Sequence, residues 1–258
     1  MTDESSVLAA TVAYNGEPFC GFARQNDLLT VQGELEQALG LLFRRPVETT
    51  CAGRTDTGVH ARGQVVSFKA SREEVENRSL RALRRSLDAL THDSIAVRSV
   101  ERKEPDFSAR FSAKAREYHY HFCCQEARPC FMDPYAWHIP HELDVAAMEQ
   151  AAGYLLGEQD FKSFCLSVSA EGKPTCRNVM ELEFYPETIM GEEVLTMRIV
   201  GNAFLHSMVR TIAGTLVAVG RGQRSPEWVR EVLAACDRRA AGQSAPAKGL
   251  VFWRVYYD

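Results

Sequence analysis

The chain has 258 residues, 45% of them hydrophobic, and a formal net charge of −4 at pH 7. This length suits one large domain or two small ones with a buried core. No apolar run approaches the roughly 20 residues that cross a bilayer, and the polar, acidic start does not resemble a secretory signal, so we expect a cytoplasmic protein without membrane attachment.

Charge is unevenly distributed along the chain. Residues 117–200 carry 14 acidic and 5 basic side chains, whereas residues 72–116 carry 8 acidic and 11 basic ones. The overall sign argues weakly against a polyanionic partner. The distribution nevertheless leaves room for an electropositive surface outside the acidic stretch.

The eight cysteines predict reduced thiols, because they are scattered through a long chain that lacks a secretory signal. No Cys-x-x-Cys pair occurs, and His119 and His121 have no third ligand nearby in the sequence. We therefore expect no metal site, and both histidines are better interpreted as surface or packed residues.

The first part of the chain alternates between strand and helix patterns. Residues 7–14 form a short apolar run typical of a buried strand. Thr30 is a candidate N-cap for a helix over 31–42, whose apolar residues recur at helical spacing. A further strand is expected over 95–100.

A glycine-bounded loop lies between two predicted strands, 47–51 and 63–70. It reads Gly53-Arg-Thr-Asp-Thr-Gly58 and carries one carboxylate, Asp56. Because glycine accepts backbone angles that other residues resist, the loop can bend sharply and present Asp56 at a fixed point. Taken alone, the motif is better explained by a solvated hairpin with an Asx-type turn, and the rest of the chain is what favours a functional loop.

A second helix is expected to start at a capping box formed by Ser71 and Glu74 and to run to about Asp88. Its apolar face carries leucines, and the opposite face carries a row of arginines at spacings of three and four. The arginines are Arg78, Arg81 and Arg85. Such a row is typical of a solvated face, but it also suits contacts with a phosphate backbone, and we predict phosphate contacts for it.

Residues 114–124 alternate as a strand. One face combines basic and aromatic side chains: Lys114, Arg116, Tyr118, Tyr120 and Phe122. This combination suits stacking on nucleobases beside phosphates, although the inner aromatics could equally be core residues. Tyr118, nearest the basic end, is the better site candidate.

The rest of the chain reads as a helix, two strands, two helices and a strand. The expected ranges are a helix capped by Asp144 and reaching Leu156, strands over 177–185 and 193–200, a helix within 201–220, a helix beginning at Ser225-Pro226, and a strand over 248–257. The Ala/Gly-rich residues 240–247 read as a loop. This order of elements predicts an α+β fold with helices packed on a largely antiparallel sheet.

Arg210 is singled out by its neighbours on the predicted helix within 201–220. His206, Ala213 and Gly214 flank it at helical spacing, and small residues allow another segment to approach closely. A sheltered arginine without a carboxylate partner is very costly. Asp56 is a candidate partner.

Several ordered blocks resemble the bacterial tRNA pseudouridine synthase A family along almost the whole chain from about Val12. They are Tyr14-Asn-Gly16, Val31-Gln32, Ala52 to Ala61, Gly63-Gln-Val-Val66, Phe107 to Ala113, Arg116-Glu-Tyr-His-Tyr120, Asn202 to His206, Met208-Val-Arg210 and Lys248-Gly-Leu250. Such a series is far more specific than any single motif.

The resemblance implies an isomerase that converts uridine to pseudouridine in the anticodon stem-loop of tRNA, at positions 38, 39 and 40, without cofactor or metal and as a homodimer. It also implies two ferredoxin-like (RRM-like) halves with the active-site cleft between them. We expect an N-terminal half, 1–112, with the Asp56 loop, and a C-terminal half, 113–258, with the tyrosine strand and the arginine helix.

Carried over by matching position, the resemblance assigns roles to five residues. Asp56 would be the catalytic carboxylate, and Arg210 would pair with it. Tyr118 would pack against the target base. Arg54 would help to hold the nucleotide out of its stack, and Leu250 would line the pocket.

The chemistry requires these residue types. The carboxylate could attack the sugar, attack C6 of the ring, or stabilise a glycal-like intermediate, and the sequence does not choose among them. In each case a nearby arginine favours the ionised form. Reaching a base inside a stem requires flipping it out, which costs a few kcal/mol of unstacking.

The chain departs from the usual family pattern at Phe22-Ala23, Leu87–Thr91 and Thr57. None of these departures removes a proposed catalytic group, but the second puts one RNA-facing loop, and the choice of target uridines, in doubt. Two rivals remain. Asp56-Thr57-Gly58 matches an aspartic protease tripeptide, but no second copy exists to share a proton. The other rival is an RNA-binding protein that has kept the fold without the activity.

Overall fold

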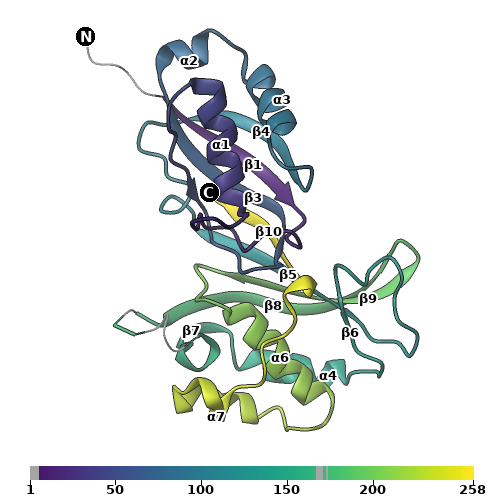
Figure 1. The fold of residues 1–258 in the computed structure, drawn as a ribbon. Helices are drawn as coiled ribbons and strands as arrows, with labels where there is room; N and C mark the ends of the chain where they lie inside the picture. The colour runs from purple at the N-terminus through teal and green to yellow at the C-terminus, as the bar shows by residue number, and fades with distance from the viewer. Residues whose placement is uncertain (1–5, 167–170, 173) are drawn as a thin grey trace. The chain divides into compact units, whose positions relative to one another are not determined.

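The computed structural model describes residues 6–166, 171, 172 and 174–258. They form two compact units, each described here by itself. Unit 1 combines Met1–Lys114 with Phe252–Asp258, and unit 2 is Ala115–Val251 (Figure 1). The expected division between residues 112 and 113 placed the end of the chain in the second half, whereas Phe252–Asp258 belong to unit 1.

Unit 1 contains an antiparallel sheet. Strand β1 (Ser6–Tyr14) pairs with β3 (His60–Ala70) on one side and with β4 (Ile95–Lys103) on the other. The two-residue β2 (Thr50–Cys51) also pairs with β3, and β10 (Leu250–Tyr256) neighbours β3 in the sheet. The end of the chain therefore completes the sheet that the beginning of the chain starts.

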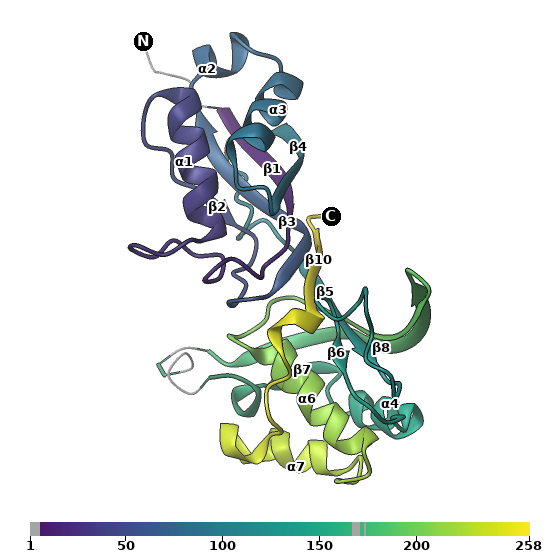
Figure 2. The same ribbon diagram turned by 45° about the vertical axis from the view of Figure 1, so that its right-hand side comes forward.

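Two helices cover this sheet side by side, α1 (Val31–Phe43) and α3 (Leu80–Leu90) (Figure 2). Thr30 caps α1 by accepting a hydrogen bond from the backbone N–H of Gly33, as predicted. Leu8, Ala10, Val12 and Tyr14 of β1 share one face and are 0–4% exposed, because a strand directs every second side chain to the same face.

The predicted single helix from Ser71 to Asp88 is wrong in one respect. The capping box at Ser71 is present, but the helix it opens, α2 (Arg72–Glu76), ends after one turn. Ser79 then caps α3 by accepting a hydrogen bond from the N–H of Ala82 at 3.1 Å. A second serine able to satisfy free N–H groups restarts the helix and leaves Arg78 outside it.

The strands of unit 2 are also largely antiparallel, and they belong to the same ten-stranded sheet as those of unit 1. Within unit 2 their order is β5 (Ala115–Cys123), β9 (Glu192–Gly201), β8 (Cys176–Ile189) and β7 (Gly157–Asp160), and the short β6 (Trp137–His138) pairs with β5 in parallel. The predicted β8–β9 pair is confirmed. Strands β6 and β7 were not predicted, because they are short and lack a run of β-branched residues.

The helices of unit 2 lie on one side of its sheet (Figure 1). They are α4 (Val145–Gly153), α6 (Met208–Gly220) and α7 (Trp228–Ala235), with 3₁₀ turns at Lys162–Phe164, Arg238–Ala240 and Ala247–Gly249. Asp144 caps α4 as predicted. Each unit thus has the predicted α+β architecture, helices on a largely antiparallel sheet. Within the described residues, no helix has the length and apolarity needed to span a membrane.

Candidate active site

The Asp56 loop connects β2 to β3 in unit 1. Its carboxylate residue is half-buried, whereas Arg54 and Thr57 are exposed. Gly58 has φ 77°, in the left-handed region, and the N–H of Val59 donates to the carbonyl oxygen of Asp56 at 3.1 Å. The predicted sharp bend is therefore present, and a glycine makes it possible.

Buried polar side chains hydrogen-bond to this loop or to its neighbouring residues. The hydroxyls of Tyr14 and Thr55 hydrogen-bond at 2.8 Å, and the side-chain amide of Gln64 donates to the carbonyl oxygen of Gly53 at 2.6 Å. Tyr14, Thr55 and Gln64 are 4%, 8% and 0% exposed. The loop is thus attached to the two central strands of unit 1 through side chains that water does not reach.

A preceding segment, residues 16–22, packs against the same loop. The N–H of Phe22 donates to the carbonyl oxygen of Thr55 at 3.0 Å, and a Cβ at Gly16 would lie 2.1 Å from the carbonyl oxygen of Val59. Phe22 itself is 1% exposed, and its ring centroid lies 6.3 Å from that of Tyr14. The departure from the family pattern at this position is therefore a core residue beneath the loop.

Arg210 lies on α6 in unit 2, where the backbone of Ala245 holds it. Its Nε donates to the carbonyl oxygen of Ala245 at 2.8 Å, and the N–H of Ala245 donates to the carbonyl oxygen of Arg210 at 2.9 Å. A Cβ at Gly214 would lie 1.8 Å from the carbonyl oxygen of Gln243. The predicted close approach of another segment to the small residues beside Arg210 is confirmed.

Tyr118 lies on β5 and is 7% exposed, with its ring edge-on to Phe204 at a centroid distance of 5.2 Å. Tyr120 and Phe122 are 0% exposed, so the core interpretation is correct for them. The side chain of Arg116 is also buried and donates to the carbonyl oxygen of Asn202 at 2.7 Å. The basic and aromatic face predicted for this strand is therefore packed rather than open.

Leu250 begins β10 and follows a segment that crosses unit 2. Within this segment, Pro246 accepts a hydrogen bond from the Tyr120 hydroxyl at 2.8 Å, and a Cβ at Gly249 would lie 2.6 Å from the Tyr120 ring. Leu250 is 5% exposed. One stretch of chain, residues 243–250, therefore contacts Arg210 and Tyr120 and carries Leu250.

The predicted site residues fall into two sets. Asp56 and Arg54 share a loop of unit 1, and Tyr118, Arg210 and Leu250 belong to unit 2. Packing or hydrogen bonds hold Tyr118 and Arg210 within unit 2, and Leu250 is buried there, whereas Arg54 is exposed on its loop. The pairing of Asp56 with Arg210 joins the two units and stays a prediction.

The arginine row of unit 1 is not uniform. Arg78 is half-buried, donates to the carbonyl oxygen of Leu42 at 3.4 Å and lies over the Phe43 ring at 5.8 Å. Arg81 and Arg85 are exposed on α3. Packing explains Arg78 at least in part, whereas the phosphate contacts predicted for the other two stay a prediction.

Sequence reasoning assigned no role to Tyr14, Thr55 or Gln64, although they attach the Asp56 loop to the sheet. The sequence does contain one indication of the role of Gln64. It is a polar residue within a predicted strand, directly before the apolar Val65-Val66. Glutamine in such a strand is either at an edge or buried with hydrogen-bond partners. Its partners are far away in sequence, so the pattern alone does not identify them.

The described residues contain no group of three histidine, cysteine or acidic side chains that could hold a metal ion. His119 hydrogen-bonds to Glu117 at 2.7 Å instead. The pKa of the Cys51 thiol, at the end of β2, is raised to about 11 because the thiol is buried, so it stays protonated near neutral pH.

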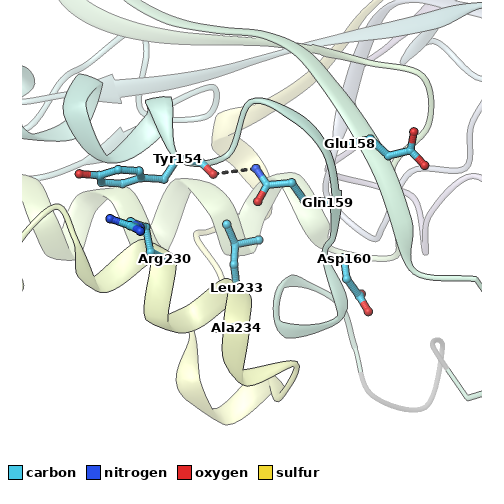
Figure 3. A pocket seen from close by; sticks show the side chains of 7 residues that line it. All are labelled: Tyr154, Glu158, Gln159, Asp160, Arg230, Leu233 and Ala234. Atoms are coloured by element: carbon cyan, nitrogen blue, oxygen red, sulfur yellow. Dashed lines mark hydrogen bonds between the residues drawn. The ribbon is translucent and has the colours of Figure 1, made fainter.

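A pocket of about 510 Å³ lies elsewhere in unit 2, between α7 and the segment around β7 (Figure 3). It is lined by Tyr154, Glu158, Gln159, Asp160, Arg230, Leu233 and Ala234. Gln159 donates to the carbonyl oxygen of Tyr154 at 2.7 Å. None of the predicted site residues lines this pocket, so it does not contribute to the candidate site.

Comparison with known proteins identifies the family of the chain. A family model described as tRNA pseudouridine synthase matches residues 10–112 and 151–258. A tRNA pseudouridine synthase A of Brevibacillus brevis is 45% identical over 97% of this chain and 99% of that protein. One of Bacillus subtilis is 42% identical over 97% and 99%.

A solved Cbf5-Nop10-Gar1 complex is 12% identical, with a TM-score of 0.35 over 81% of this chain and 45% of that one. A TM-score this low does not establish a shared fold. The family assignment rests on the sequence relatives, whose similarity covers both units.

Proposed function

The chain belongs to the tRNA pseudouridine synthase family and is an isomerase of uridine in tRNA, and from that premise we propose that it acts on the anticodon stem-loop, at positions 38, 39 and 40. The reaction breaks the bond between N1 of uracil and C1′ of the ribose. The uracil turns, C5 bonds to C1′, the proton leaves C5, and N1, freed from C1′, gains a proton. Nothing is oxidised or reduced.

Asp56 is the catalytic carboxylate in this proposal. The single observation that supports this role is how the loop is held. Asp56 is half-buried and lies in a bend made by Gly58, and the buried side chains of Tyr14 and Gln64 hydrogen-bond to the loop. An acid placed so firmly can meet a reacting atom without reorganising. It acts by attacking C1′, by attacking C6, or by stabilising a glycal-like intermediate.

Arg210 pairs with Asp56 across an active-site cleft between the two halves of the chain, 1–112 and 113–258. The hydrogen bond from its Nε to Ala245 supports this role, because it fixes the side chain while the rest of the guanidinium still carries donors. A fixed cation beside the acid keeps the carboxylate ionised in a pocket from which water is excluded.

Three more residues complete the pocket. Tyr118 packs against the target base, and its ring is already held by Phe204. Leu250 supplies an apolar wall that keeps the freed uracil in place while it turns. Arg54, exposed on the Asp56 loop, holds the flipped nucleotide out of its stack.

The location, oligomeric state and tRNA contacts are inferred from the same family membership. The protein works as a cytoplasmic homodimer and needs neither metal nor cofactor. Arg81 and Arg85 contact the phosphate backbone of the tRNA, supported by their exposure on one face of α3. Arg78 contributes less to such contacts, because its side chain packs on Phe43.

Pseudouridine mapping in defined transcripts tests the choice of target. An anticodon-arm transcript with uridines at 38, 39 and 40 is compared with three transcripts in which one of these uridines is replaced by cytidine, and with one that lacks all three. We expect pseudouridine at each remaining position and none in the last transcript. Modification of a different uridine of the transcript, with these three untouched, would refute the assignment.

A further inference from the structure

We propose that Tyr14, Gln64 and Thr55 form a positioning network for the reaction, whose role is to fix the carboxylate of Asp56. This inference rests on the proposed function, because it assigns Asp56 the chemical step. None of the three residues needs to touch the substrate: they act through the loop that carries Asp56.

Gln64 is one part of the network, and both polar atoms of its amide are engaged. Its amide nitrogen donates to the carbonyl oxygen of Gly53 at 2.6 Å and its oxygen accepts from the N–H of Val65 at 3.2 Å. The hydroxyl of Tyr14 hydrogen-bonds to the hydroxyl of Thr55 at 2.8 Å. Two buried hydrogen bonds therefore hold the Asp56 loop, one at Gly53 and one at Thr55.

The network restrains the residues immediately around Asp56. Thr55, its neighbour, is held twice: its hydroxyl by Tyr14 and its carbonyl oxygen by the N–H of Phe22 at 3.0 Å. On the other side, the carbonyl oxygen of Asp56 accepts from the N–H of Val59 at 3.1 Å. With the backbone fixed at both ends of the residue, the position of the carboxylate depends on little more than its own side-chain rotation.

Burial makes the network sensitive to a single missing atom. Gln64 is 0% exposed and Tyr14 is 4% exposed, so water does not replace a lost partner. Burial also raises the pKa of Tyr14, and the hydrogen bond with Thr55 opposes this only in part. The hydroxyl therefore stays protonated and able to donate near neutral pH.

The network is more than a core contact because it connects to the reacting group. Displacing a catalytic group by about 1 Å can cost about 100-fold in rate, whereas substrate affinity depends on many other contacts. Loss of one hydroxyl from the network should therefore lower the rate of the chemical step and leave tRNA binding unchanged. A purely structural role would instead lower stability and leave the rate of the folded enzyme unchanged.

Single-turnover kinetics with excess enzyme, on tRNA labelled with tritium at uridine C5, separate these roles. We expect Tyr14→Phe and Thr55→Val each to slow tritium release by about 10-fold, and the double variant to be no slower than the worse single one. Thr55→Ser keeps the hydroxyl and should retain most of the wild-type rate. The tRNA Kd of each variant should match that of the wild type.

Tyr185→Phe is the matched control. It removes a tyrosine hydroxyl that hydrogen-bonds to Nδ1 of His119 at 3.4 Å and belongs to unit 2, whereas the Asp56 loop belongs to unit 1. Both tyrosine variants should have a lower Tm than the wild type, but only Tyr14→Phe should slow the reaction. Wild-type rates in Tyr14→Phe, or equal slowing in both variants, would overturn the inference alone; absence of tritium release from the wild type would overturn the proposed function with it.

Discussion

Asp56 and Arg210 are held in opposite ways. The loop of Asp56 is attached to unit 1 by side chains, through the Tyr14 and Thr55 hydroxyls and the Gln64 amide. Arg210 is held in unit 2 by backbone, through two hydrogen bonds to Ala245. The first arrangement depends on the identity of distant residues, and the second depends on the path of one chain segment.

The difference shows which kind of substitution should disturb each half of the site. A substitution that keeps volume but removes one polar atom should damage the Asp56 side. On the Arg210 side position 245 offers no polar side-chain atom to remove, because Ala245 contacts Arg210 through its backbone N–H and carbonyl oxygen. There, damage requires pushing the segment away from α6.

The largest expected effect comes from removing the two charged groups themselves. We expect Asp56→Ala to lower turnover by at least about 10³-fold and Arg210→Ala by a smaller factor, with the double variant no slower than Asp56→Ala, because residues that act as a unit are not additive. Turnover is followed by tritium release and affinity by filter binding. Losses that multiply in the double variant would contradict the pairing.

Gly214→Ala should break the backbone arrangement of unit 2. Its Cβ would lie 1.8 Å from the carbonyl oxygen of Gln243, so the segment must move away from α6 and take Ala245 with it. We expect a loss of about 1–3 kcal/mol in the free energy of unfolding, measured in urea, together with slower turnover. Gly153→Ala on α4 is the control, because a Cβ there meets no atom within 4 Å; destabilisation by both would refute the argument.

The arginines of unit 1 should separate into two classes. Arg81→Ala with Arg85→Ala should weaken tRNA binding and reduce the slope of log Kd against log salt by about 1.4–1.8, with stability unchanged. Arg78→Ala should lower stability instead, because that side chain packs on Phe43 and donates to Leu42. A triple variant that binds tRNA with unchanged affinity and salt slope would return Arg81 and Arg85 to a solvated face and leave Arg78 with its packing role alone.

The smallest expected effect is a pH dependence of stability in unit 2. The pKa of His119 is lowered from 6.5, mainly because burial disfavours the charged ring, and the hydrogen bond and charge of Glu117 oppose this. The unfolded chain therefore binds more protons between the lowered pKa and 6.5, so this contribution is complete above pH 6.5 and is lost as the pH falls below it.

Urea unfolding at pH 7.5 and 5.5 measures the effect. His119→Gln should flatten the loss of stability on acidification, whereas replacing the exposed His141 by glutamine should leave it as in the wild type. Arg198, which also contacts Glu117 at 3.0 Å, is kept in both variants so that the surrounding charge is unchanged. Equal pH dependence in all three proteins would contradict the role given to His119.

Local signals predicted most of the fold. The caps at Thr30, Ser71 and Asp144 and the β8–β9 pair follow from spacing within a few residues. The break at Ser79 was missed because a helix-compatible pattern continued through it. The alternation on β5 suggested one open face, but every residue of the strand is buried because other elements cover both sides.

Only those parts of the site that lie within one short motif could be predicted from the sequence. Asp56 stands out because glycines bound its loop, and the small residues beside Arg210 indicated that another segment approaches. The partners of Gln64 and the path of residues 243–250 depend on contacts between distant parts of the chain, so no local spacing reveals them. Resemblance to a family identified the roles, while the packing had to come from the structure.

The most direct test of the central claim is tritium release by Asp56→Asn, which keeps the volume of the side chain and removes only its charge. Wild-type enzyme and variant are each mixed in excess with anticodon-arm tRNA labelled at uridine C5. We expect the wild type to release tritium in step with pseudouridine formation and the variant to bind the tRNA equally well while releasing almost none. Release at the wild-type rate by Asp56→Asn would show that the carboxylate is not the group that performs the reaction.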